Sequence, residues 1–213
     1  MININTFVFN PFQENTYILS DNSGECVIVD AGCYFEEEFK QLFNFISSNK
    51  LIPVKLLNTH GHIDHILGVP RLSEFYNLAP EFHKDEMFLV KNAVEQGKLF
   101  GLNYNPVLKT EARLEEGSMI NFGHSQLKVL HVPGHTKGSV AFVSESDNFI
   151  ITGDVLFKGS IGRTDLPGEG DYNTLLKSIK NKLLVYNDEV LIFPGHGPSS
   201  TIGKERNTNP FLV

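Results

Sequence analysis

The sequence has few cysteines, fewer basic than acidic residues, and no long apolar run. Its two cysteines, Cys26 and Cys33, do not have a spacing that suggests a disulfide framework. The 18 Lys and Arg residues and 25 Asp and Glu residues give the chain a net charge of −7, which argues against nucleic acid as the main partner. No apolar run approaches membrane-spanning length, and no basic segment leads into an apolar stretch after Met1. We therefore expect a cytoplasmic protein without a membrane partner, and the oligomeric state stays open.

The chain length and the order of apolar patterns predict a sandwich of two sheets. With 213 residues, 41% of them hydrophobic, the chain can build a large core, and we expect a single domain over residues 1–213. Strands followed by helices in each half suit two packed sheets with helices outside. Alternation of polar and apolar residues predicts an edge strand over residues 2–9, and turn residues predict a hairpin at 21–24. Apolar residues at helical spacing predict four helices, over residues 35–48, 66–76, 86–100 and 171–184. The tail, residues 203–213, is long enough for one helical turn and a docking arm.

Residues 59–65, Thr-His-Gly-His-Ile-Asp-His, concentrate metal-binding side chains directly after the apolar run 54–57. His60 and His62 are two positions apart, so in an extended segment they project to the same side and can bind one metal ion. Asp64 and His65 follow where the chain should turn into a helix, which can direct them to a neighbouring position. A solvated polar loop or a helix cap is the alternative. Three histidines and one aspartate at a strand end favour the metal site instead.

Three later loops repeat one arrangement, in which an apolar strand is followed by glycine and then by a residue of metal-ligand type. His135 follows Gly134, Asp154 follows Gly153, and His196 follows Gly195. If these strand ends gather at one edge of a sheet, four loops deliver seven ligands to one cleft.

This order of residues resembles the metallo-β-lactamase superfamily, over nearly the whole chain. The resemblance implies an α/β (α+β) fold of four αββα layers, with the metals at one edge between the sheets. Segments 134–139, 153–157 and 162–165 further resemble the glyoxalase-II-like hydrolases, although persulfide dioxygenases carry almost the same set.

The resemblance also assigns the ligands to two divalent ions, zinc in the first place, with iron or manganese as alternatives. Two ions about 3.5–4 Å apart can share a water and lower its pKa from about 15.7 towards 7, which gives a hydroxide able to attack a carbonyl. We therefore expect Asp64 and Asp154 to be the catalytic carboxylates. The assigned sets are His60, His62 and His135 for the first ion, Asp64, His65 and His196 for the second, and Asp154 as the bridge.

Glyoxalase-II resemblance implies a small-molecule thioester such as S-lactoylglutathione as the substrate. Arg163 matches a position where those enzymes have a basic residue near the glutathione, and an internal contact with Asp165 is the alternative. Typical glyoxalase II proteins carry an added C-terminal helical domain that helps to hold glutathione, whereas this chain ends at Val213, which puts the substrate in doubt. The resemblance places Asp30 beside the metals as a partner of a ligating imidazole, and a turn-forming aspartate is the alternative.

Other functions remain open at this point. A persulfide dioxygenase would hold a single iron on two histidines and one carboxylate. A metal-binding protein without catalysis would require a lost substrate pocket, because all seven ligands are present, and a lactonase or β-lactamase has no specific residue in its favour. Neither cysteine is needed for hydrolysis, although Cys33 could sit near the mouth of the cleft.

Overall fold

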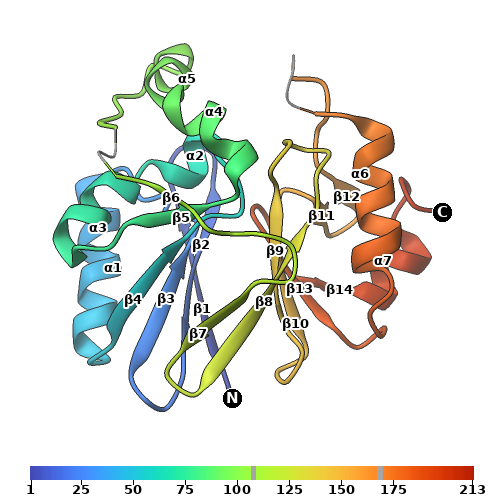
Figure 1. The fold of residues 1–213 in the computed structure, drawn as a ribbon, viewed down its shortest axis with the longest axis horizontal. Coiled ribbons are helices and arrows are strands. Elements are labelled where there is room, and N and C mark those ends of the chain that lie inside the picture. The colour runs from blue at the N-terminus through green and yellow to red at the C-terminus, as the bar shows by residue number, and fades with distance from the viewer. Residues whose placement is uncertain (107–108, 167–169) are drawn as a thin grey trace.

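The computed structural model describes residues 1–106, 109–166 and 170–213. It shows two six-stranded sheets packed face to face, with helices on both outer faces (Figure 1). The helices of the first half of the chain lie on one side of this pair of sheets, and those of the second half lie on the other. The predicted four-layer αββα sandwich is therefore confirmed.

The first sheet begins antiparallel and continues parallel from its third strand. The predicted edge strand is confirmed, because β1 lies at one end of the strand order. The predicted hairpin turn joins β2 to β3. The six strands are β1 (Asn3–Phe9), β2 (Glu14–Ser20), β3 (Glu25–Val29), β4 (Ile52–Leu57), β5 (Pro80–Phe82) and β6 (Glu111–Ala112).

The second sheet runs in the order β14-β13-β10-β9-β8-β7, with one parallel pair, β10 and β13. A short separate hairpin, β11 and β12, follows β10. The strands of the second sheet are β7 (Met119–Phe122), β8 (Ser125–His131), β9 (Val140–Ser144), β10 (Phe149–Gly153), β13 (Leu191–Pro194) and β14 (Ser200–Thr201), and those of the hairpin are β11 (Leu156–Phe157) and β12 (Ser160–Ile161).

The helices form largely where apolar spacing predicts them. Helix α1 has three glutamates in its first turn, where the helix dipole favours negative charge, and it buries Phe39, Leu42 and Ile46 against the first sheet. Pro70 lies in the first turn of α3, where its missing N–H costs nothing. The helices are α1 (Glu36–Ser48), α2 (Ile63–Ile66), α3 (Val69–Tyr76), η1 (Lys84–Glu86), α4 (Met87–Lys91), α5 (Ala93–Leu99), α6 (Tyr172–Ser178), η2 (Ile179–Leu183) and α7 (Ile202–Thr208).

The prediction of one continuous helix over residues 86–100 is wrong. Asn92 ends α4 and begins α5, and its side-chain amide donates to the Phe88 carbonyl at 2.7 Å. This local hydrogen bond competes with the helical pattern, as asparagine side chains commonly do. The expected irregular segment 101–110 is seen as far as it is described, and residues 107–108 lie outside the described residues.

The prediction of a single helical turn in the tail is also wrong. The seven-residue helix α7 packs onto the second half of the molecule through Ile202. Its Glu205 is fully buried and accepts hydrogen bonds from Ser200 Oγ, Gly159 N and Asn209 Nδ2. The tail is thus part of the folded core rather than a surface arm.

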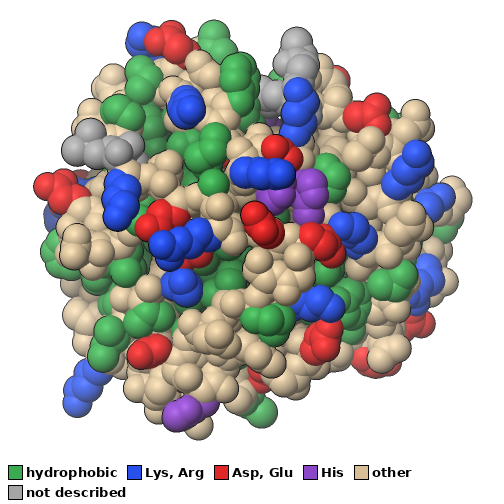
Figure 2. Space-filling model, viewed as in Figure 1, with side chains coloured by type: hydrophobic (Ala, Val, Ile, Leu, Met, Phe, Trp, Pro, Cys, Tyr) green, Lys and Arg blue, Asp and Glu red, His purple; other side chains and the backbone are tan. Residues whose placement is uncertain are grey.

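The apolar core has three parts, and the central one lies between the sheets. It joins Tyr17, Val27 and Leu57 of the first sheet to Phe122 and Phe142 of the second. The other two parts lie under the helices on either side. On the face drawn in Figure 2, basic and acidic side chains are intermixed. Within the described residues, no helix combines the length and the apolar character needed to cross a membrane.

Candidate metal centre

Three imidazoles from two loops converge on one point. His62 Nδ1 lies 3.0 Å from His60 Nε2 and 2.9 Å from His135 Nε2, and the two Nε2 atoms are 3.3 Å apart. Tetrahedral ligands at 2.0–2.1 Å from a zinc ion lie about 3.3 Å from one another, so this spacing is close to that of a coordinated set. These nitrogens can therefore face a single cation.

A second group lies beside the first and contains carboxylates. Asp64 Oδ2 is 3.1 Å from His196 Nε2 and 3.7 Å from His65 Nε2. Asp154 lies between the two groups: its Oδ1 is 3.4 Å from His65 Nε2, and its Oδ2 is 3.6 Å from His196 Nε2 and 3.8 Å from His135 Nε2. The structure thus brings together all seven residues that the sequence singled out, and Asp154 stands where a bridge would.

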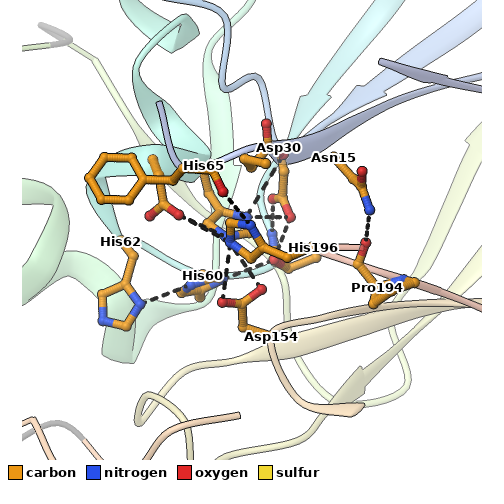
Figure 3. A network of polar contacts seen from close by, with 12 residues as sticks. Asn15, Asp30, His60, His62, His65, Asp154, Pro194 and His196 are labelled. Atoms are coloured by element: carbon orange, nitrogen blue, oxygen red, sulfur yellow. Dashed lines mark hydrogen bonds and ion pairs between the residues drawn. The ribbon is translucent and has the colours of Figure 1, made fainter. Parts of the chain in front are cut away.

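The seven residues come together because four strands end at the same edge of the sandwich. The loops after β4, β8, β10 and β13 carry them, and α2 carries Asp64 and His65. In Figure 3, His65 and His196 point toward Asp154, and His62 points toward His60. The repeated strand-glycine-ligand pattern of the sequence therefore corresponds to a common edge.

Four of the five histidines are held at Nδ1, which leaves Nε2 directed to the centre. The Nδ1 of His135 donates to the Arg163 carbonyl at 2.8 Å, and that of His196 donates to the Phe12 carbonyl at 3.1 Å. These contacts fix the tautomer and the orientation of each ring, as outer partners of metal ligands do.

Asp30 holds the remaining two rings, directly and through Thr59. Its Oδ2 is 3.1 Å from His65 Nδ1 and accepts from Thr59 Oγ1 at 2.6 Å, while its Oδ1 accepts from Thr59 N at 2.6 Å. Because Thr59 Oγ1 donates to Asp30, it accepts from His60 Nδ1, which lies 3.0 Å away. Asp30 also has a left-handed φ of 50°, which a non-glycine residue adopts at some cost. Its geometry is that of an orienting carboxylate.

The charges of the site divide the histidines into two kinds. Burial and the neighbouring imidazoles hold the pKa of His60 well below its usual value, and burial lowers the pKa of His135 to about 4. Burial also opposes the charged form of His65, but the carboxylates of Asp64 and Asp154 outweigh it and raise its pKa well above the usual value. Without a metal, His60 and His135 are therefore neutral, while His65 carries the proton that balances the carboxylates.

The donor set fits divalent metal ions. Five imidazoles and two carboxylates are the ligands that zinc, iron and manganese accept. Within the described residues, His65 Nε2 and Asp154 Oδ1 are buried without a hydrogen-bond partner, although they face each other. Buried polar atoms are rarely left so, and a cation between these groups would satisfy both.

The other predicted residues lie nearby or elsewhere. Arg163 forms a forked ion pair with Asp165, at 2.8 and 3.0 Å, while its own carbonyl holds His135. Cys33 is fully buried in the core of the first half, so the expectation that it sits near the cleft mouth is wrong.

Sequence reasoning missed several side chains that support the site. Glu14 is fully buried, and its Oε1 lies 3.9 Å from His65 Nδ1. Asn15 Nδ2 donates to the Pro194 carbonyl, as Figure 3 shows, and to the Gly197 carbonyl on the other side of His196. Both lie at the start of β2, whereas the predicted ligands follow the ends of strands, so no pattern in the sequence marks them.

Comparisons with known proteins agree with this geometry. The family model described as the metallo-beta-lactamase superfamily matches residues 9–196. The chain is 37% identical over 213 residues to the hydroxyacylglutathione hydrolase GloC of Haemophilus influenzae, covering 99% of this chain and 98% of that protein.

Two solved structures are also similar. The crystal structure of TTHA1623 in a di-iron-bound form has a TM-score of 0.87 and 38% identity, covering 98% of this chain and 100% of that one. That of the BLEG-1 B3 metallo-beta-lactamase has a TM-score of 0.87 and 32% identity, covering 99% and 100%. On its ligand geometry and these matches, the chain belongs to the metallo-β-lactamase superfamily, a superfamily of metal-dependent hydrolases.

Proposed function

We propose that this protein hydrolyses small-molecule thioesters such as S-lactoylglutathione at a centre of two divalent metal ions. The observation that carries the proposal is the arrangement of seven ligands in two adjoining groups, with Asp154 between them. Similarity over nearly its whole length to a hydroxyacylglutathione hydrolase supports the choice of substrate.

In this proposal His60, His62 and His135 hold one ion, Asp64, His65 and His196 hold the other, and Asp154 holds both. Bound there, two such ions would supply a water of lowered pKa as the nucleophile and would polarise the carbonyl of the thioester. Zinc is the first choice of metal, and the similarity to a di-iron protein makes iron a real alternative.

The protein's own groups would orient these ligands and handle protons. Asp30 and the backbone carbonyls of Phe12 and Arg163 keep the imidazoles in place, so that no reorganisation is needed when substrate binds. Asp64 Oδ2, which faces His196 at 3.1 Å, is placed to take part in proton transfer as well as ligation. Arg163 lies in the loop that orients His135 and can meet a substrate carboxylate once it leaves Asp165.

A substrate panel tests the proposal. Metal-loaded protein is assayed with S-lactoylglutathione, a simple acyl thioester, a lactone and a β-lactam, and the release of free thiol or acid is followed. We expect the glutathione thioester to have the highest kcat/KM. Oxygen consumption and sulfite formation with glutathione persulfide, without thioester cleavage, would overturn the proposal in favour of a dioxygenase.

A further inference from the structure

Outside the ligand set, one buried carboxylate links the two loops of the three-histidine group. Glu86 is 1% exposed and lies at the end of η1, directly before α4. Its Oε2 accepts from Gly61 N at 2.7 Å, between His60 and His62. Its Oε1 accepts from Thr136 Oγ1 at 2.6 Å and from Gly138 N at 2.7 Å, next to His135.

The loops are shaped to let Glu86 approach. A Cβ at Gly138 would lie 2.8 Å from both Glu86 N and Glu86 Oε1, which is closer than side chains allow. A Cβ at Gly61 would lie 3.2 Å from Glu86 Oε2 and 2.9 Å from Leu89 Cβ. Glycine at both positions therefore permits a contact that a larger residue would push apart.

The three donors require an acceptor with two oxygens. An ionised carboxylate accepts at both, whereas an amide offers one acceptor and one donor. Thr136 Oγ1 donates to Glu86, so it accepts from Ser139 Oγ, 2.6 Å away, and its orientation is also fixed. The two loops follow strands of different sheets, β4 and β8, and the Glu86 carboxylate accepts hydrogen bonds from both.

We propose that Glu86 is a positioning residue that sets the distance between the His60–His62 loop and the His135 loop and so determines how tightly the first metal ion binds. The inference rests on the proposed function, since it concerns the metal site of that function. In this proposal Glu86 acts through two backbone amides and a hydroxyl.

The test is the metal affinity of Glu86→Gln. In this variant the amide must face one of the loops with a donor, so one loop loses its anchor. We expect Zn²⁺ to dissociate from the three-histidine group about 10-fold more readily, in competition with a chromogenic chelator, as for other changes beside metal ligands. Glu205→Gln is the matched control, because Glu205 is also a fully buried carboxylate with three donors but contacts neither loop.

The outcomes separate the inference from the function. Zn²⁺ affinity of Glu86→Gln within twofold of the unaltered protein, or an equal loss in Glu205→Gln, would overturn the positioning role alone. If Glu86→Gln does not fold, Thr136→Val removes one of the three donors at nearly constant shape and should weaken binding about threefold; unchanged affinity would again overturn the inference. Failure of the unaltered protein to bind any of Zn²⁺, Fe²⁺ and Mn²⁺ would overturn the proposed function itself.

Discussion

At the scale of the residue, the site is defined less by which side chains are present than by how each is held. His65 and His135 each have one nitrogen anchored by an oxygen and the other directed inward. Anchoring the ring before the metal arrives reduces the entropy lost on binding and selects the tautomer that a metal needs. The orienting groups, such as Asp30, are therefore as much a part of the site as the ligands.

In the proposed function Asp154 bridges the two ions, so we expect it to be the most sensitive single residue. We expect Asp154→Ala to reduce turnover at least about 100-fold, because it removes a carboxylate that faces both groups. The protein should remain folded, since the Asp154 side chain faces polar ligand residues rather than the apolar core. Steady-state kinetics and circular dichroism measure the two effects, with His124→Ala, an exposed histidine far from the site, as the control. Full turnover in Asp154→Ala would contradict the mechanism.

Arg163 and its partner offer a test of substrate charge. We expect Arg163→Ala to raise the KM for a glutathione thioester about 2- to 5-fold, the range of an exposed ion pair, with kcat nearly unchanged. Asp165→Asn should lower the same KM, because it removes the carboxylate that occupies the guanidinium at 2.8 Å. A neutral thioester without the glutathione carboxylates is the control substrate, and an equal effect on both substrates would argue against this contact.

At the scale of the element, hairpins at the edge away from the metal centre are tied together by one aspartate. Asp21 accepts from Ser23 N and Oγ in its own turn, and from His124 N and Ser125 Oγ in the turn between β7 and β8. Burial alone raises the pKa of Asp21, but these hydrogen bonds outweigh it and hold the pKa well below its usual value.

The pH dependence of this contribution has a definite sign. Because the folded pKa of Asp21 is depressed, its stabilisation is complete above the unfolded pKa, about 3.9, and is lost as the pH falls through the folded value. We expect Asp21→Asn to lower the free energy of unfolding by about 1.5 kcal/mol at pH 7 and by less at pH 3. Urea unfolding at both pH values measures this. His124→Ala, which keeps the backbone donor, should have little effect; a pH-independent loss in Asp21→Asn would contradict the account.

The elements also show what a sequence can and cannot reveal. His135, Asp154 and His196 are predictable because each follows an apolar strand and a glycine, and the other four ligands are predictable because they cluster in residues 60–65 after the apolar run 54–57. Glu86 is not, since it sits in a helical pattern where glutamate is ordinary, and only the fold brings it to Gly61 and Gly138. The break at Asn92 depends on a hydrogen bond from its side chain to the Phe88 carbonyl, which competes with the helical hydrogen bonds. The spacing of apolar residues therefore does not predict where the helix breaks.

At the scale of the whole molecule, the two halves share the core between the sheets. This predicts a single cooperative unfolding transition for residues 1–213, because neither sheet keeps its inner face covered without the other. We expect Phe142→Ala, at a fully buried site in that core, to lower the free energy of unfolding by about 3–5 kcal/mol without splitting the transition. Phe88→Ala, at a position 70% exposed, should change it by less than about 0.5 kcal/mol. Two separate transitions by far-UV and near-UV circular dichroism would contradict a single domain.

The central claim is that the seven gathered side chains hold two metal ions. The most direct measurement is the metal content per chain, by elemental analysis of protein purified without chelator or added metal. The account predicts close to two equivalents of zinc, or of zinc, iron and manganese together, and a fall in that number in Asp154→Ala. One equivalent of iron with no second metal, or almost no metal at all, would contradict it.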